Sequence, residues 1–271
     1  MKKMTLFLFL ALCATQFMSC SKSSYTTPEP SVSWTATVAM SAKFEVPAAP
    51  AGRAETASAD LQLLSDNTLK YNIVVTNLSG SDALKAAHIH FGNAGVSGPI
   101  FISLDGTFSG STVTGTVKLS AGQADTLKNM ESYVNVHSTQ FGGGLVRGQV
   151  DSKVVFAADV VLNGASEVPA VTTTATGLAV IRMTENKKLY VKTTITNLEA
   201  GDAMTFAHFH SGTSAVSGPV ILGFYSSAAD FGTLKTVSAD DAFYNTLLTG
   251  AVYVNTHSSL HGSGLIRGQI R

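Results

Sequence analysis

From residue 34 onward, apolar and polar residues alternate over short segments of the chain. Such alternation, bounded by Gly, Ser or Asn, is typical of half-buried strands. The segments with this pattern are 69–78, 111–119, 133–137, 144–150, 188–198, 251–257 and 264–270. Two other segments, 120–130 and 238–248, open with Ser and carry acidic residues in their early turns, which predicts two short helices.

The pattern is duplicated. "YVNVHSTQFGGGLVRGQV" (133–150) aligns with "YVNTHSSLHGSGLIRGQI" (253–270), and "HIHFGNAGVSGPI" (88–100) aligns with "HFHSGTSAVSGPV" (208–220), both at an offset of 120 residues. This period is far longer than that of a solenoid repeat, so we expect two tandem domains, 34–151 and 152–271. Roughly eight strands per copy, with frequent turns, predict an all-β chain of two Greek-key antiparallel β-sandwich domains, each with one short helix.

Composition and charge exclude several classes of function. The 271 residues include 18 Lys and Arg and 18 Asp and Glu, so the net charge is zero, and no basic run follows the first residues. Nucleic-acid binding through a basic surface is therefore not expected. The chain has no phosphate-binding loop, dinucleotide fingerprint or nucleophile elbow, and its carboxylates show no acid–base pairing. We therefore expect no enzymatic activity.

The N-terminus has the character of an export signal. "MKK" precedes an apolar run, and "FMSC" ends at Cys20. This segment resembles a bacterial lipoprotein signal, which implies a signal peptide over 1–19 and lipidation of Cys20. The Ser-, Thr- and Pro-rich stretch 20–33 predicts a flexible tether. We therefore expect a protein anchored by lipid to a membrane of the cell envelope, at the outer membrane, facing the periplasm or the surface.

Cysteine usage agrees with this expectation. The chain has two cysteines, and Cys13 lies inside the apolar run of the predicted signal peptide. The mature protein would retain Cys20 alone, with its sulfur acylated. A disulfide framework and thiolate chemistry are therefore excluded.

The repeated motifs resemble those of a known family. "EVP" near the start of each copy, "H-x-H" followed by "SGP" in the middle, and "YVN-x-HS" with "GL[VI]RGQ[VI]" at the end are similar to the CHRD domain, named after chordin. The resemblance covers nearly all of the predicted mature chain. It implies an extracellular, immunoglobulin-like β domain and no particular activity.

The histidines are also laid out as in copper/zinc superoxide dismutase, another Greek-key β-sandwich. That enzyme takes copper ligands from a His-x-His strand and a third His on a late strand. His88, His90 and His137 (the first histidine set) match this layout, as do His208, His210 and His257 (the second histidine set). Neither copy has a further His between these positions to bridge a second metal, and the dismutase disulfide is absent. These departures argue against dismutase activity.

Strand geometry predicts that each histidine set lies on one face. Residues i and i+2 of a strand point the same way, so His88 and His90 project together, with Ala87, Ile89 and Phe91 on the core side. By the same rule, Tyr133, Asn135 and His137 share a face, and Arg147 and Gln149 extend it. In the second copy the corresponding residues are Tyr253, Asn255, His257, Arg267 and Gln269.

Three imidazoles with an open position suit Zn²⁺ or Cu²⁺. The alternative is a hydrogen-bonded polar network with no ion, in which the histidines bond to Asn, Ser or backbone groups. Arg147 and Arg267 could bind an anion or a carboxylate partner. The favoured expectation is that they pair locally, with Glu45 and Glu167 of the "EVP" segments as the partners.

Three functions remain open. The first is a non-enzymatic, membrane-anchored lipoprotein whose two domains bind an envelope protein or a glycan. The second is a copper- or zinc-binding protein that uses one three-His site in each repeat and could be redox-active. The third is an envelope spacer whose repeats only stack.

Overall fold

The computed structural model of the chain describes residues 28–47 and 49–271. The predicted signal peptide, Cys20 and the first part of the predicted tether lie outside the described residues. None of the helices among the described residues is long and apolar enough to cross a membrane. The two repeats are built alike, as the sequence duplication predicts.

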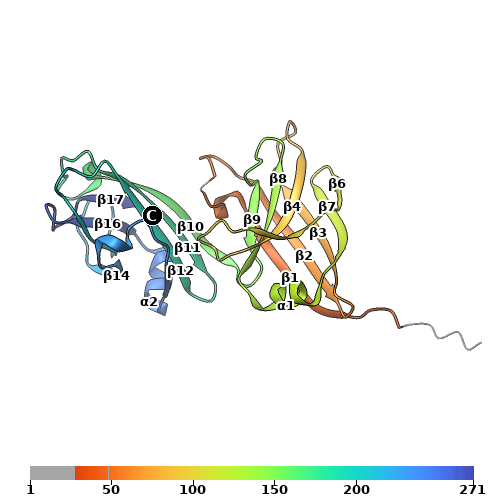
Figure 1. The fold of residues 1–271 in the computed structure, drawn as a ribbon. Helices are drawn as coiled ribbons and strands as arrows, with labels where there is room; N and C mark the ends of the chain where they lie inside the picture. The colour runs from red at the N-terminus through yellow and green to blue at the C-terminus, as the bar shows by residue number, and fades with distance from the viewer. Residues whose placement is uncertain (1–27, 48) are drawn as a thin grey trace, which may run out of the picture. The chain divides into compact units, whose positions relative to one another are not determined.

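The strands of the first repeat form one antiparallel sheet (Figure 1). In sheet order they are β5 (Ile100–Ser103), β4 (Leu84–Phe91), β8 (Ser132–Ser138), β9 (Val146–Gln149), β1 (Val32–Ser41), β2 (Thr56–Leu64), β3 (Thr68–Thr76), β7 (Thr112–Lys118) and β6 (Thr107–Ser109). The helix α1 (Ala121–Asn129) connects β7 to β8, and the 3₁₀ turn η1 (Ala42–Phe44) follows β1. The first and last strands of the repeat, β1 and β9, pair at Ser41 and Arg147, which joins the two halves of the sheet.

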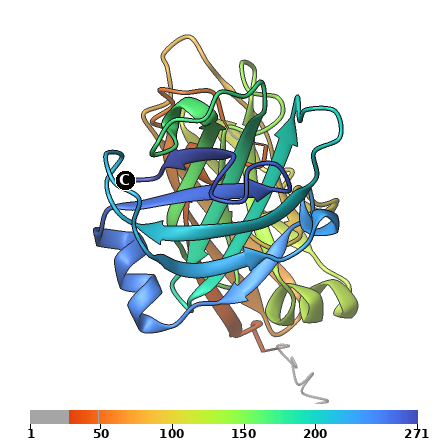
Figure 2. The ribbon, with the colours of Figure 1, turned by 90° about the vertical axis from the view of Figure 1, so that its left-hand side faces the viewer.

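The second repeat follows the same plan. Its sheet order is β14 (Val220–Tyr225), β13 (Met204–Ser211), β16 (Val252–Ser258), β17 (Ile266–Gln269), β10 (Val154–Asn163), β11 (Thr176–Thr184), β12 (Lys188–Thr196) and β15 (Lys235–Ser238). The helix α2 (Asp241–Thr249) and the 3₁₀ turns η2 (Gly164–Ser166) and η3 (Ala228–Asp230) complete it. Figure 2 shows β13, β14, β16 and β17 crossing over β10–β12, so the sheet curls into a sandwich.

Alternation along the strands builds one core in each repeat. In β2 the side chains of Ala57, Ala59, Leu61 and Leu63 are buried while the residues between them are exposed. The apolar faces of the curled sheet meet in a continuous cluster in each repeat. The predicted all-β, two-domain sandwich is confirmed.

Two local expectations need correction. Phe91 was expected in the core, but it is the last residue of β4, remains 37% exposed and stacks on Phe101. The second helix was expected to open at Ser238, yet Ser238 still pairs with Lys188 at the end of β15. Its N-cap is Asp240, whose carboxylate accepts from the backbone N–H of Phe243. Ser120 caps α1 as expected, in a capping box with Gln123.

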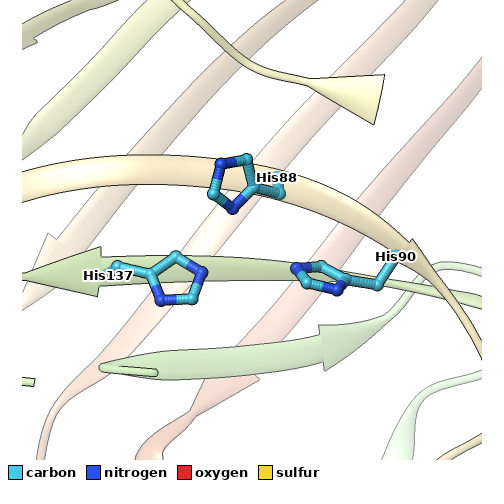
Figure 3. Close-up of side chains that lie close together, drawn as sticks. All are labelled: His88, His90 and His137. Carbon is cyan, nitrogen blue, oxygen red and sulfur yellow. The ribbon is translucent and has the colours of Figure 1, made fainter. Parts of the chain in front are cut away.

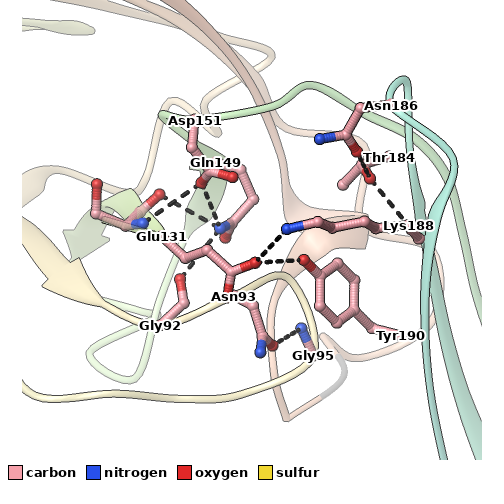
Figure 4. A network of polar contacts seen from close by, with 11 residues as sticks. Gly92, Asn93, Gly95, Glu131, Gln149, Asp151, Thr184, Asn186, Lys188 and Tyr190 are labelled. Atoms are coloured by element: carbon pink, nitrogen blue, oxygen red, sulfur yellow. Dashed lines mark hydrogen bonds and ion pairs between the residues drawn. The ribbon is translucent and has the colours of Figure 1, made fainter. Parts of the chain in front are cut away.

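Polar contacts join residues of the two repeats (Figure 4), and a small apolar cluster adds to them. Glu131 Oε1 accepts from Lys188 Nζ at 3.1 Å and from the Tyr190 hydroxyl at 2.8 Å. Tyr190 also packs with Ala94 and Val154 in a small buried cluster. The position equivalent to Glu131 in the second repeat is Ala251. The contact of Glu131 with Lys188 and Tyr190 therefore has no counterpart in the second repeat.

Candidate metal site

The first histidine set lies on two paired strands. His88 and His90 are two residues apart on β4, and His137 is on β8. In the antiparallel register His88 faces Asn135 and His90 faces Tyr133. Ala87 precedes His88, and Ile89 lies between the two histidines. Both side chains are buried in the core, so the imidazoles point to the opposite face. The predicted facing of β4 and β8 is confirmed.

The three imidazoles converge on one point (Figure 3). Ring centroids are 5.7 Å apart for His88 and His90, 5.0 Å for His88 and His137, and 6.3 Å for His90 and His137. One nitrogen from each ring lies within 4.8 Å of the other two. Three nitrogens at these separations can ligate one ion, because Zn–N bonds are about 2.0–2.1 Å long.

Hydrogen bonds to backbone carbonyl oxygens determine which nitrogen of each imidazole carries a proton and which has a free lone pair. His90 Nδ1 is 2.9 Å from the Gly98 oxygen, and His137 Nδ1 is 3.0 Å from the Gly142 oxygen. A carbonyl oxygen can only accept, so each Nδ1 carries the proton and each Nε2 presents a lone pair. These Nε2 atoms and His88 Nδ1 are buried and have no hydrogen-bond partner. Carbonyl bonds to the far ring nitrogen are the usual way in which proteins orient metal-binding histidines.

The second histidine set repeats this geometry. His210 Nδ1 is 2.9 Å from the Gly218 oxygen, and His257 Nδ1 is 3.1 Å from the Gly262 oxygen. The ring centroids of His208 are 5.8 Å from His210 and 5.0 Å from His257. Here His257 Nε2 is 3.3 Å from His208 Nδ1, while His210 Nε2 is buried without a partner.

Burial favours the neutral, metal-binding form of these rings. Loss of solvent lowers the pKa of His88, His90, His137, His208 and His257 below the usual histidine value. In His88 the neighbouring rings of His137 and His90 lower the pKa further. An ion entering near neutral pH would therefore displace few protons from the imidazoles.

An aromatic ring and a guanidinium group pack against one histidine of each set. Tyr133 stacks on His90, and the Arg147 guanidinium lies 3.5 Å above the other face of the Tyr133 ring. The Tyr133 hydroxyl accepts from the backbone N–H of Gly98, at 3.0 Å. Gly98, whose carbonyl oxygen orients the His90 ring, is thus also held by Tyr133.

The expected pairing of Arg147 with Glu45 is wrong. Arg147 is 1% exposed, and it donates to the backbone oxygens of Val96 at 2.7 Å and Asn93 at 2.6 Å. Among the described residues it makes no salt bridge, and burial lowers its pKa to about 10. Arg267 likewise donates to the oxygens of Val216 and Thr213 instead of pairing with Glu167. These arginines hold the loop after the His-x-His strand in place.

The roles of Glu45, Glu167 and Gly98 were not identified from the sequence. Glu45 Oε2 accepts from Asn135 Nδ2 at 3.2 Å, and both Glu45 and Glu167 are buried. The motif "EVP" occurs in both copies, and this repetition was the sequence signal for the buried carboxyls. Gly98 was also missed: a Cβ there would lie 1.8 Å from the Phe91 oxygen, so only glycine lets the loop reach the His90 ring. The repeated "SGP" carried this information.

A model of the CHRD domain matches residues 36–150 and again residues 158–270. No curated protein and no solved structure matches the chain significantly. The two matched ranges cover most of the chain, and each contains one complete histidine set. The chain therefore belongs to the CHRD-domain family and carries two tandem copies of the domain.

Proposed function

We propose that the chain is a non-enzymatic tandem binding protein whose two CHRD domains each bind one divalent transition-metal ion, Cu²⁺ or Zn²⁺, through a three-His site. The observation that carries this proposal is the fixed tautomer of His90, His137 and His210, whose unpaired Nε2 atoms face the centre of each histidine set. The arrangement occurs twice, at equivalent positions.

The polar-network alternative explains the geometry less well. In a hydrogen-bonded network each buried nitrogen would have a donor or an acceptor, because an unpaired buried polar atom costs about 1–3 kcal/mol. In the first set, one buried nitrogen on each of the three rings lacks a hydrogen-bond partner. In the second set, His257 Nε2 lies 3.3 Å from His208 Nδ1 and 3.2 Å from Asn255 Oδ1, and His210 Nε2 has no partner. An ion at the shared point would satisfy the unpaired nitrogens of both sets.

The three nitrogen ligands favour a metal ion of intermediate hardness. Three neutral imidazole nitrogens suit Zn²⁺, Cu²⁺ and Ni²⁺, whereas Ca²⁺ and Mg²⁺ prefer oxygen ligands. Among divalent ions, the general affinity order favours Cu²⁺ over Zn²⁺ at such a site. With three protein ligands, at least one coordination position remains for water or another molecule.

Metal stoichiometry tests the proposal. Purified protein, stripped with a chelator and then dialysed against micromolar Cu²⁺ or Zn²⁺, should retain two ions per chain by elemental analysis. His90→Ala or His210→Ala should each leave one ion, and the double variant none. His261→Ala is the matched control, because His261 belongs to neither set, and it should keep two ions. Wild-type protein that retains no ion contradicts the proposal.

We also infer that Cys20 carries a lipid that anchors the protein in the cell envelope. The support is sequence-based: a basic start, an apolar run, "FMSC" and a polar stretch before the first domain. Cys20→Ala should move the protein from the membrane fraction to the soluble fraction of the producing cell and abolish labelling with a radioactive fatty acid. Membrane retention of the Cys20→Ala variant contradicts this inference.

A further inference from the structure

A buried carboxyl group lies beside each histidine set. Glu45 follows η1, is 4% exposed, and its Oε1 has no hydrogen-bond partner. Glu167 occupies the same position after η2, is 8% exposed, and its Oε1 also lacks a partner. Neither carboxyl makes a salt bridge within the part of the chain that the structure describes.

An asparagine connects each carboxyl to the histidine face. Asn135 lies on β8 two residues before His137 and across from His88 on β4. It donates to Glu45 at 3.2 Å, and its own Oδ1 is buried without a partner. In the second repeat Asn255 Oδ1 lies 3.2 Å from His257 Nε2. One amide side chain thus separates each carboxyl from a predicted metal ligand.

Close packing holds the carboxyl in this position. A Cβ on Gly144 would lie 2.5–2.8 Å from the Glu45 carboxyl atoms, and one on Gly264 would lie 2.9 Å from those of Glu167. Both glycines have φ near +145°, at +149° and +144°, a region that favours glycine. The "GGGL" and "GSGL" segments therefore leave room for the carboxyl in both repeats.

The charged groups that act most strongly on each carboxyl are arginines, of which Arg53 is also paired with Glu55 and Arg182 with Asp159. Arg147 on β9, Arg53 before β2 and Arg182 on β11 act on Glu45 through space, and Arg267 on β17 acts on Glu167. The guanidinium of Arg182 donates to the backbone oxygen of Glu45, not to its carboxyl. Burial outweighs these charges and raises the pKa of both Glu45 and Glu167 to about 7. Near neutral pH, each carboxyl is therefore divided between its protonated and ionised forms.

A bound ion would change the balance of charge. Three neutral imidazoles contribute no negative charge, so a divalent ion would bring two positive charges into a region that already contains buried arginine. Such an ion stabilises a nearby carboxylate over the protonated acid. The carboxyl is the acidic group hydrogen-bonded to the asparagine of this face, so it is the group that can compensate the ion.

We propose that Glu45 and Glu167 are the counter-charges of the two metal sites, each losing a proton when an ion binds and regaining it when the ion leaves. This inference rests on the proposed metal-binding function. The step is balanced: the aqueous ion and a protonated carboxyl become the three-His complex, a carboxylate and one proton released to solvent. Each site would accordingly bind its ion more weakly as the pH falls, even before the imidazoles take up protons.

Calorimetry with Zn²⁺ tests this proposal. At pH 7.0, titrations in buffers with different ionisation enthalpies count the protons released per ion. We expect a fraction of a proton per site from the carboxyl, because its pKa of about 7 leaves it partly protonated at this pH. In the Glu45→Gln/Glu167→Gln variant this release should vanish. At pH 8, where the wild-type carboxyls are ionised, the variant should bind Zn²⁺ about tenfold more weakly.

The controls separate this proposal from the metal site itself. Asp60→Asn removes an exposed carboxylate of β2 that bonds to Thr37, and it should leave proton release and affinity unchanged. If the wild type binds no ion, the proposed function fails. If the wild type binds two ions but the glutamine variant releases the same number of protons, the counter-charge proposal alone fails.

A measurement on the wild-type protein avoids dependence on the folding of the variant. The infrared difference spectrum between metal-free and Zn²⁺-loaded protein at pH 6.5 should show loss of a protonated carboxylic acid band and gain of carboxylate bands. Metal binding without any loss of the carboxylic acid band overturns the proposal.

Discussion

The ring of His90 lies flat against the ring of Tyr133, with 4.8 Å between centroids and 10° between planes. His210 and Tyr253 repeat the relationship at 4.7 Å and 9°. Because β4 and β8 place these two residues directly opposite each other, the stack follows from the register of the strands. It fixes the plane of the imidazole, and with it the direction of the Nε2 lone pair.

Replacing Tyr133 should therefore weaken the first metal site selectively. We expect Tyr133→Leu to reduce Cu²⁺ or Zn²⁺ affinity at one site about tenfold, as loss of a group that orients a ligand commonly does. Tyr133→Phe keeps the stack and loses the hydroxyl bond to Gly98, so its effect should be smaller. Two-site calorimetric titration distinguishes these cases. Tyr253→Leu should produce the same loss at the other site, and equal weakening of both sites by Tyr133→Leu would contradict the prediction.

The glycines beside the buried carboxyls offer a test of packing. Gly144→Ala would force a Cβ to within 2.5–2.8 Å of the Glu45 carboxyl at a φ of +149°, so we expect a loss of about 2 kcal/mol or more of unfolding free energy. Urea unfolding at pH 7 measures it. Gly143→Ala is the control, since a Cβ there meets nothing within 4 Å. Equal stability of the two variants would show that the carboxyl is not held where the structure places it.

The sequence predicted the fold well because strand alternation is a local signal and the duplication can be read directly from the aligned motifs. Strands β8 and β9 and the helix α1 fall where the alternating and capped segments were expected. The grouping of His88, His90 and His137 followed from the i, i+2 rule and from the assumption, which is correct, that their strands are neighbours. No local signal marked the true end of β15, since Ser238 suits both a strand end and a helix cap.

The hydrogen bonds of the buried arginine and carboxyl groups near the histidines could not be predicted in the same way. The pairing of Arg147 with Glu45 was inferred from opposite charge, but the guanidinium satisfies backbone oxygens of the loop 92–98 instead. Which carbonyl a buried arginine reaches depends on the path of a loop with no regular pattern. The link between Glu45 and Asn135 joins residues 90 positions apart, which only the folded chain brings together.

The raised pKa of Glu45 makes the stability of the metal-free protein depend on pH. The carboxyl titrates at about 7 when folded and near 4.5 when unfolded, so its stabilising effect is complete below pH 4.5 and is lost as the pH rises through 7. The rise from 4.5 to about 7 corresponds to about 3 kcal/mol. Between pH 5 and pH 8, wild-type protein should therefore lose about 2 kcal/mol or more of stability relative to Glu45→Gln.

Comparison with the glutamine variant is essential to that measurement. The buried histidines have lowered pKa values, so their contribution runs the other way and is lost as the pH falls. They titrate alike in both proteins, and the difference between the two unfolding free energies isolates Glu45. Urea unfolding in the presence of a chelator gives this difference at each pH. A constant difference from pH 5 to pH 8 would mean that Glu45 titrates normally in the folded protein.

Metal removal should lower the stability of the folded domains. An ion that binds only the native arrangement of three histidines stabilises it by about 2.7 kcal/mol per site when the free ion is at 100 times its dissociation constant. We expect a chelator to lower the melting temperature of wild-type protein, and His90→Ala/His210→Ala to melt at the same temperature with or without Zn²⁺. Differential scanning calorimetry measures both. His90→Ala alone should retain part of the response, because the second histidine set is intact in that variant; a complete loss would show that the two domains do not bind ions independently.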